Sequence, residues 1–367
     1  MYDIGRSKRA TRAYGLDDVS IVPSRRTRDT DQVSLDWRID ALTFDFPIMA
    51  APMDSVMSPR TAIEFGRLGG LGVLNLEGLW TRYEDPSGLL EELAGIDDPL
   101  AATHRMQEIY AEPIKKELIT ERMSQIRAAG VPVAGSLSPK NASQFADVVE
   151  KAGVDFFVIR GTTVSAEHVS DRSDVLDLRK FIYDLDVPVI VGGCATYQTA
   201  LHLMRTGAAG VLVGFGGGAA HTTRQVLGIE VPMASAIADV AEARRDYMDE
   251  SGGRYVHVIA DGSVGRSGDI AKAIACGADA VMVGSPLARA KEAPGQGWHW
   301  GSEAWHGTLP RGERVRFDSV GTLAEVVNGP SRIPDGTMNL VGGLRQSMAT
   351  TGYSDVKSFQ RIELILH

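Results

Sequence analysis

The sequence predicts a (β/α)₈ TIM barrel, and two observations lead to this fold class. Eight short apolar runs recur along the chain, and segments with helical patterns separate them. The chain, at 367 residues, is also long enough for such a barrel with additional segments. Continuous apolar runs are typical of parallel strands that are buried on both faces. Eight β/α units in one continuous chain favour a closed barrel over a doubly wound sheet.

The expected strands each end near Gly, Ala or a polar residue. They are residues 46–53, 71–75, 131–137, 154–161, 187–193, 209–215, 255–262 and 279–285. The expected helices between them begin at capping residues and end at glycine. Ser58 followed by Pro59 is a typical helix start. Gly153 and Gly207 close two later helical patterns, as expected of helix C-termini.

Three segments lie outside the repeat. Within residues 1–45, the stretch 16–25 is expected to form a hairpin or a lid on one end of the barrel. Residues 76–130 are rich in helix formers and interrupted by proline, which predicts two or three helices. Residues 292–335 are dense in Gly, Pro and Trp, and long irregular segments of this kind are usually functional. We therefore expect a single domain over 1–367 with a C-terminal flap.

Composition limits the compartment and the partners. A net charge of −9 argues against a general nucleic-acid or anionic membrane surface, although backbone amides can still form a local phosphate pocket. Two cysteines are too few for a disulfide framework, and no C-x-x-C pattern suggests a metal site. The N-terminus lacks the apolar core of a signal peptide, and no run is long enough for a membrane span. We expect a reducing, cytoplasmic setting.

The loops after the seventh and eighth expected strands indicate a phosphate site. In a barrel of this kind the active site lies at the C-terminal ends of the strands, and these two loops commonly hold a phosphate. The expected phosphate ligands are Gly262, Ser263, Gly284 and Ser285. Asp261 precedes them and is suited to accept hydrogen bonds from the vicinal diol of a ribose. In the alternative interpretation, the glycines only form turns and Asp261 caps a helix.

Seven segments together resemble the IMP dehydrogenase/GMP reductase family over nearly the whole chain. They are LDDVSIVPS (16–24), PIMAAPMDSV (47–56), GGLGVLN (69–75), GGCATYQTA (192–200), GFGGGAAHTTR (214–224), IADGSVGRSGDIAKAIACGADAVMVGS (259–285) and GGLRQSMATTGY (342–353). The resemblance implies a barrel, usually a homotetramer, that binds a purine nucleoside 5′-monophosphate. It also implies oxidoreductase chemistry in purine metabolism with NAD or NADP as the nicotinamide cofactor.

The resemblance also assigns further binding residues. Asp261 would hold the ribose hydroxyls, and the four loop residues named above would hold the phosphate. The remaining contacts are Met53 against the purine, the backbone of Gly218 and Ala219, and a segment around Trp300 and Gly301 that closes over the nucleotide. The chain is most similar to short family members without a CBS pair, because residues 76–130 show no CBS-like βαβ pattern. We expect no adenine-nucleotide regulation through such a domain.

The chain departs from the family at the catalytic position. The family reaction uses a cysteine thiolate that adds to C2 of the purine. Counting back from Thr223 and Arg224, His221 stands at this position. His221 could be an acid/base or purine-binding group, a nucleophile, or a loop residue without a chemical role. Cys194, at the end of the fifth strand, is an alternative thiol, and Cys276 is assigned to packing.

The cofactor side also differs. The family's Asp-Ser-Ser type triplet near the nicotinamide ribose is replaced by Arg160, Gly161 and Thr162. Arginine has no acceptor for ribose hydroxyls, so Arg160 would bind a phosphate or carboxylate, or pair with a nearby acid. Thr223 matches the threonine that orients the incoming water or ammonia, or else it caps a helix or loop. Arg311 is a weak match to the flap's Arg-Tyr pair.

Two functional hypotheses remain open from the sequence. In the first, the chain is an IMP- or GMP-directed oxidoreductase with a modified mechanism. In the second, it is a catalytically inactive purine-nucleotide-binding or regulatory paralogue. The phosphate loops support both, the missing cysteine supports the second, and the retained threonines and the long flap support the first. An FMN-dependent barrel shares the two-loop phosphate site but not the purine-type motifs.

Overall fold

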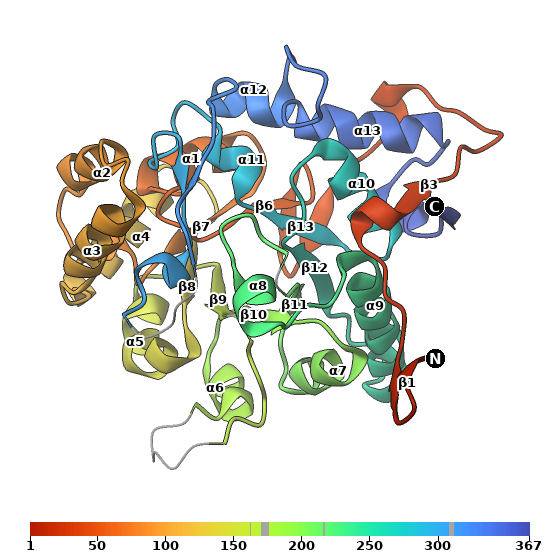
Figure 1. Cartoon of the computed structure of the whole chain (residues 1–367), viewed down its shortest axis with the longest axis horizontal. Helices are drawn as coiled ribbons and strands as arrows, with labels where there is room; N and C mark the ends of the chain where they lie inside the picture. The colour runs from red at the N-terminus through yellow and green to blue at the C-terminus, as the bar shows by residue number, and fades with distance from the viewer. Residues whose placement is uncertain (162, 170–175, 216, 308–311) are drawn as a thin grey trace.

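The computed structural model describes residues 1–161, 163–169, 176–215, 217–307 and 312–367. Eight parallel strands close into a barrel, which confirms the predicted fold class and excludes the doubly wound alternative. In Figure 1 these strands form a central ring surrounded by helices. They are β6 (Ile48–Ala50), β7 (Leu71–Asn75), β8 (Ala134–Leu137), β9 (Phe156–Arg160), β10 (Val189–Cys194), β11 (Gly210–Val213), β12 (His257–Asp261) and β13 (Ala280–Val283). Each lies within or next to one of the eight expected runs.

Helices follow the strands and cover the barrel from outside. They are α1 (Pro59–Arg67), α4 (Lys116–Ala128), α5 (Pro139–Lys151), α6 (Leu178–Asp184), α7 (Tyr197–Arg205), α9 (Met233–Glu250), α10 (Ser267–Ala275) and α11 (Ser285–Ala288). The Ser58 side chain caps α1 by accepting a hydrogen bond from the backbone amide of Thr61. Helix and strand approach closely at Gly72, where a Cβ would lie 2.8 Å from the Cα of Ala62.

The excursion between β7 and β8 is helical in the structure. It contains a 3₁₀ turn (Leu79–Thr81), α2 (Ser87–Ala94), α3 (Pro99–Tyr110) and then α4. A second apolar cluster, separate from the main core, joins α2 and α3 to the flap through buried Trp300 and Ala304. The excursion therefore positions one side of the flap over the barrel rim.

The stretch 16–25, expected to form a hairpin or a lid, contains no local hairpin, whereas its first residues, Leu16, Asp17 and Asp18, border the cavity at the barrel rim. Strand β3 (Val19–Ile21), inside the stretch 16–25, pairs antiparallel with β16 (Leu364–Leu366) at the other end of the chain. Hairpins occur on either side of it, as β1 (Tyr2–Gly5) with β2 (Lys8–Ala10), and as β4 (Trp37–Ile39) with β5 (Leu42–Phe44). The second hairpin closes the N-terminal end of the barrel, where Trp37 Nε1 donates to His257 Nδ1 at 3.3 Å.

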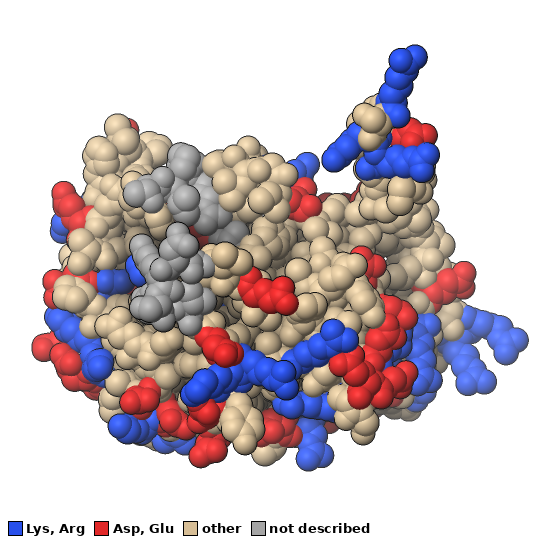
Figure 2. All heavy atoms as spheres, turned by 90° about the horizontal axis from the view of Figure 1, so that it is seen from below, with Lys and Arg blue, Asp and Glu red and all other residues tan. Residues whose placement is uncertain are grey.

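The C-terminal flap crosses the opposite end of the barrel. Strand β14 (Trp298–His299) pairs antiparallel with β15 (Val315–Arg316), and a 3₁₀ turn (Ser302–Trp305) lies between them. Three helices complete the chain: α12 (Leu323–Asn328), α13 (Leu340–Thr350) and α14 (Val356–Phe359). Acidic and basic side chains are interspersed over the face in Figure 2. Within the described ranges, no helix combines the length and apolarity needed to cross a bilayer.

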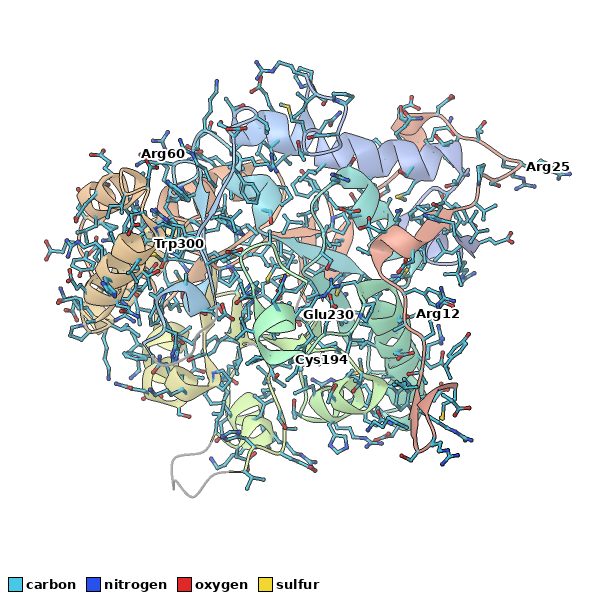
Figure 3. All side chains as sticks on the ribbon, in the orientation of Figure 1. Arg12, Arg25, Arg60, Cys194, Glu230 and Trp300 are labelled. Atoms are coloured by element: carbon cyan, nitrogen blue, oxygen red, sulfur yellow. The ribbon has the colours of Figure 1, made fainter. Side chains whose placement is uncertain are left out.

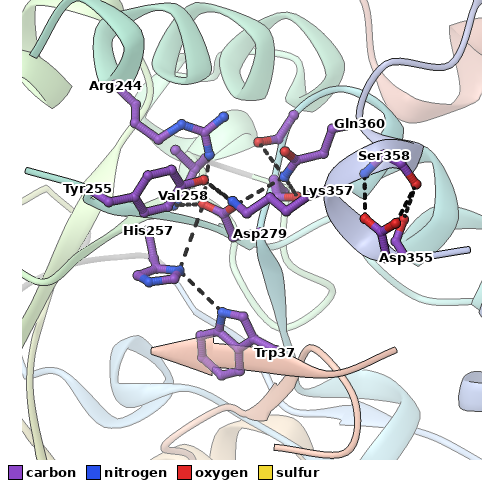
Figure 4. Close-up of polar contacts among 12 residues, drawn as sticks. Trp37, Arg244, Tyr255, His257, Val258, Asp279, Asp355, Lys357, Ser358 and Gln360 are labelled. Atoms are coloured by element: carbon purple, nitrogen blue, oxygen red, sulfur yellow. Dashed lines mark hydrogen bonds and ion pairs between the residues drawn. The ribbon is translucent and has the colours of Figure 1, made fainter. Parts of the chain in front are cut away.

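A buried carboxylate organises the N-terminal end of the barrel (Figure 4). Asp279 precedes β13, and its Oδ2 accepts hydrogen bonds from Arg244 Nη1 at 2.7 Å and from the Val258 amide at 2.9 Å. Its Oδ1 accepts from Tyr255 at 2.7 Å and also from Lys357. Burial raises the pKa of Asp279, but the charges of Arg244 and Lys357 outweigh burial and hold it well below its usual value. The network is remote from the rim and serves stability.

We predict that Asp279→Asn destabilises the protein by about 3–5 kcal/mol, because it leaves the buried guanidinium of Arg244 without its counter-charge. The free energy of unfolding should be measured by urea denaturation at one fixed protein concentration. Glu250→Gln is the matched control, since Glu250 forms a half-exposed ion pair with Arg205, and its effect on stability should be far smaller than that of Asp279→Asn. A loss below about 1 kcal/mol for Asp279→Asn would contradict the structural role of the network.

We predict that His257 makes the protein less stable as the pH is lowered from about 6.5 to about 4. Burial lowers the pKa of His257 to about 4, so the unfolded chain binds a proton in this window that the folded chain does not. The slope from this residue is at most about 1.4 kcal/mol per pH unit. Urea denaturation across this window should give a shallower slope for His257→Gln. His104→Gln, on an exposed face of α3, should keep the wild-type slope, and equal slopes for all three proteins would refute the assignment.

Candidate active site

A cavity of about 750 Å³ lies at the C-terminal ends of the barrel strands. Loops after β6, β9, β11, β12 and β13 and the flap together line it. Twelve of the residues expected from the sequence meet there: Met53, Arg160, Gly161, Gly218, Ala219, His221, Thr223, Asp261, Gly262, Ser263, Gly284 and Ser285. Two others, Thr162 and Arg311, lie outside the described residues.

The glycine-rich loops pack tightly against one another. A Cβ at Gly214 would lie 1.7 Å from the carbonyl oxygen of Asp261, and one at Gly217 would lie 2.0 Å from Ser263 Oγ. Ser263 has a positive φ of 56°, and both its amide and its hydroxyl donate to the Gly217 carbonyl at 3.1 Å. Close packing between the loops after β11 and β12 therefore already requires these glycines, whether or not a phosphate also binds there.

Arg160 and Asp261 form an ion pair inside the cavity. Arg160 Nε donates to Asp261 Oδ2 at 2.9 Å, and Nη2 donates to Oδ1 at 3.4 Å. Their side chains are only 19% and 14% exposed. Of the alternatives for Arg160, pairing with a nearby acid is the one that the structure contains. The carboxylate expected to receive ribose hydroxyls thus already accepts two hydrogen bonds, and a ribose has to use its remaining lone pairs.

His221 is also paired with an acid. Its Nδ1 lies 3.1 Å from Oε2 of Glu303, which the 3₁₀ turn of the flap places over the cavity. Burial raises the pKa of Glu303, but the hydrogen bond and charge of His221 and the charge of Arg160 hold it well below its usual value. Glu303 was not identified from the sequence, because it lies in an irregular segment with no periodic or motif signal.

A second histidine, His299 of the flap, lines the same cavity. His299 Nδ1 is 3.1 Å from Ser55 Oγ, and the ring lies beside Gly284 and Met53, where a Cβ on Gly284 would be 3.2 Å from both. Burial, together with the charge of His221, lowers the pKa of His299 to about 3. His299 is therefore neutral near pH 7, and sequence reasoning did not single it out.

Thr223 is buried and begins the short helix α8 (Thr223–Leu227) at the cavity wall. The residue before it, Thr222, accepts a hydrogen bond through Oγ1 from the amide of Gly312 at 2.6 Å. This bond ties the flap to the loop that carries His221. Thr223 is the first residue of α8, directly after the N-cap residue Thr222. Its role in orienting water or ammonia stays a prediction.

A second cavity of about 490 Å³ adjoins the first. The two share Met53, Arg160, Ser302 and Glu303 as lining residues. Trp300 and Gly301 line this second cavity rather than the first. Trp300 is buried, and its Nε1 donates to Tyr110 Oη at 3.0 Å. Figure 3 shows Trp300 on the side of the barrel that faces α2 and α3.

Asp54 is a buried acid on the wall of the second cavity. Its Oδ2 accepts hydrogen bonds from Tyr110 Oη at 2.6 Å and from the Leu79 amide at 3.2 Å. Its Oδ1 has no hydrogen-bond partner among the described residues. Burial raises the pKa of Asp54 to about 6, against the opposing effects of these bonds and of Arg82. Asp54, in the loop after β6, thus binds Tyr110 of α3, and Tyr110 in turn accepts a hydrogen bond from Trp300 of the flap.

Neither cysteine can supply a thiolate to the cavities. Cys194 is buried in β10, its Sγ donates to the Leu212 carbonyl at 3.5 Å, and burial raises its pKa to about 12. Cys276 follows α10, and burial raises its pKa to about 11. Neither residue lines either cavity. The alternative in which Cys194 supplies the thiolate is therefore wrong, because its thiol lies in the core and bonds to the Leu212 carbonyl.

Comparison with known proteins places these features in a family. A model of the IMP dehydrogenase / GMP reductase domain matches residues 13–304. A Mycobacterium tuberculosis protein named as an uncharacterized oxidoreductase is 52% identical over 99% of both chains. An inosine-5′-monophosphate dehydrogenase of Thermoplasma acidophilum is 38% identical and covers 96% of this chain and 91% of its own. The crystal structure of an IMP dehydrogenase/GMP reductase-like protein from Corynebacterium glutamicum has a TM-score of 0.95 and 50% identity, covering 100% and 97% of the two chains.

We predict that Arg160 and Asp261 are energetically coupled by about 1–3 kcal/mol, because both charges are largely withdrawn from water. A double-mutant cycle with Arg160→Met and Asp261→Asn, measured by urea denaturation, gives this coupling. The matched control is the cycle for Arg205 and Glu250, whose side chains are 45% and 47% exposed. That surface pair should show a clearly weaker coupling than Arg160 and Asp261. Equal coupling in the two cycles would mean that the rim pair is not held in a desolvated site.

Proposed function

The chain belongs to the IMP dehydrogenase/GMP reductase family, and from this premise we propose that it is a nicotinamide-dependent oxidoreductase of IMP or GMP. The observation that carries the proposal is the cavity of about 750 Å³, where the expected nucleotide-binding residues from separate loops converge. Its size is typical of a small-molecule site. Its position at the C-terminal rim is where barrel enzymes bind substrate.

The nucleotide is proposed to lie across the rim from the loops to the flap. Its phosphate contacts the loops at Gly262–Ser263 and Gly284–Ser285, and its ribose contacts Asp261. Met53 and the backbone of Gly218 and Ala219 then border the purine. For the phosphate to use the Ser263 amide, the hydrogen bond to Gly217 has to be exchanged for one to the ligand, because the amide has a single proton.

The second cavity fits the nicotinamide cofactor. It adjoins the purine end of the first cavity through Arg160 and Glu303, and Ser138, Lys140 and Asn141 line it as possible ligands for ribose and phosphate. When bound, the nicotinamide supplies a hydride acceptor or donor. Arg160, Gly161 and Thr162 stand at the family's cofactor position, and the Arg160 guanidinium, which is paired with Asp261, borders both cavities. The cofactor is NAD or NADP.

His221 is proposed to stand where the family has its cysteine. No thiol lines either cavity, and both cysteines of the chain are among the described residues. This absence favours a second candidate, a purine-nucleotide-binding or regulatory paralogue without turnover. The pairing of His221 with the buried Glu303 favours the enzyme, because a binding protein has no need to orient an imidazole with a carboxylate.

The remaining assignments concern assembly and regulation. We propose a homotetramer, as the family resemblance implies, and a single domain. Between β7 and β8 the described chain forms helices and a 3₁₀ turn, with no strand from which a CBS pair could be built. We therefore propose that adenine nucleotides do not regulate this chain through such a pair.

We predict turnover with IMP plus NAD or with GMP plus NADPH, followed by the absorbance of the reduced nicotinamide. The nucleotide should also raise the melting temperature, since a ligand at 100 times its Kd stabilises by about 2.7 kcal/mol. Asp261→Ala should lose this rise, whereas Glu313→Gln, on the exposed side of the flap, should retain it. A rise in melting temperature without turnover in either mixture would establish the binding paralogue. No rise with either nucleotide would reject both candidates.

A further inference from the structure

Among the described residues of the cavity, one ring nitrogen of His221 is available to accept a proton. A carboxylate has no proton to donate, so Nδ1 of His221 is the donor in its contact with Glu303 Oε2 at 3.1 Å. The opposite nitrogen, Nε2, has no hydrogen-bond partner among the described residues. In the neutral ring this nitrogen is therefore the proton acceptor, and its residue lines the cavity.

Two glycines leave room for the imidazole in this orientation. A Cβ at Gly218 would lie 2.5 Å from Cδ2 of His221, and a Cβ at Gly301 would lie 3.1 Å from its Cε1. The ring is thus held between the loop after β11 and the flap. Glu303 is largely buried, with 9% of its side chain exposed, so water does not compete effectively for the Nδ1 proton. The pair is fixed in one tautomer by packing as well as by charge.

We propose that His221, positioned by Glu303, adds water directly to C2 of the bound purine, so that water replaces the protein thiol as the nucleophile. This inference rests on the proposed function for the identity of the substrate. It follows from a cavity whose lining contains an oriented imidazole and no cysteine. His221 is the catalytic residue, and Glu303 is a positioning residue that acts through it.

The step is balanced without any protein adduct. The water oxygen forms a bond to C2, the π pair of the C2=N3 bond moves to N3, and the water proton passes to Nε2 of His221. The imidazolium that forms is stabilised by ionised Glu303, and its Nε2 proton then passes to N3. The net change is addition of H and OH across C2=N3. In hydrated IMP, C2 still carries its hydrogen, and the proposed oxidation removes this hydrogen as hydride.

Oxygen exchange tests this step without a cofactor. Xanthosine 5′-monophosphate has a carbonyl at C2. Adding labelled water there moves the π pair of C2=O to its oxygen, which takes up the proton, and gives a geminal diol. Loss of the original oxygen as water then leaves the label at C2. We predict that the protein catalyses entry of ¹⁸O from H₂¹⁸O into this position, measured by mass spectrometry of the recovered nucleotide. Glu303→Gln and His221→Gln should each lower the exchange rate by about 10²-fold or more. Both variants should keep the rise in melting temperature with the nucleotide, since binding does not require the proton transfer.

Two controls separate this step from a structural effect and from a thiol route. Glu313→Gln changes an exposed acid of the same flap and should exchange at the wild-type rate. The double variant Cys194→Ala/Cys276→Ala should also exchange at that rate, because neither thiol lines the cavities. Loss of exchange in a folded cysteine variant, or retention of exchange in Glu303→Gln, would overturn the proposal.

The outcomes distinguish this inference from the proposed function. If the nucleotide raises the melting temperature but exchange is no faster than in buffer, direct hydration is rejected and the nucleotide site stands. If exchange occurs without nicotinamide turnover, hydration stands and the oxidoreductase assignment is rejected. If IMP, GMP and xanthosine 5′-monophosphate all fail to raise the melting temperature, both proposals are rejected together.

Discussion

Closure of the barrel is the constraint on which the candidate site depends. Parallel strands in a ring bring their C-terminal ends to one rim, so residues far apart in sequence meet there. Arg160 ends β9 and Asp261 ends β12, and the two form a hydrogen-bonded ion pair across 101 positions of the chain. The flap then adds Glu303 from beyond the last barrel strand. Without closure, none of these charges would have its partner.

The cavity contains two paired acids, and this arrangement has an energetic consequence. Withdrawing a charge from water is costly, and an ion pair recovers that free energy only with good hydrogen-bond geometry. Asp261 meets this condition through two nitrogens of Arg160, and Glu303 forms an ion pair with His221 at 3.1 Å. Arg160 also lowers the pKa of Glu303, so the two pairs are coupled. A ligand that disturbs one pair is therefore expected to alter the other.

The sequence predicted the barrel well because its signal is local and repeated: each apolar run is a strand buried on both faces. The loops of the site could be predicted equally well, because glycine clusters follow three of these runs. Pairing could not be predicted in the same way. Strand β3 pairs with β16 from the other end of the chain, and Arg160 had several conceivable anionic partners. Glu303 and His299 lie in an irregular flap, where no periodicity indicates which side chains face inward. Cys194 was placed at the correct strand end, but a strand buried on both faces does not reveal which way its last side chain points.

The position of Glu303 bears on whether the cavity is a relic of a lost activity. A site that has only lost its nucleophile retains the binding loops and has no reason to place a second charged group beside the substituted residue. Here His221, which we propose stands at the nucleophile position, contacts a carboxylate that is largely buried, and two glycines leave space for the imidazole between them. A largely buried carboxylate is costly without a cationic or hydrogen-bonding group beside it, and His221 is one such group for Glu303, so the two residues are expected to depend on each other. This interdependence, at the rim and not in the core, is what a working proton-transfer pair requires.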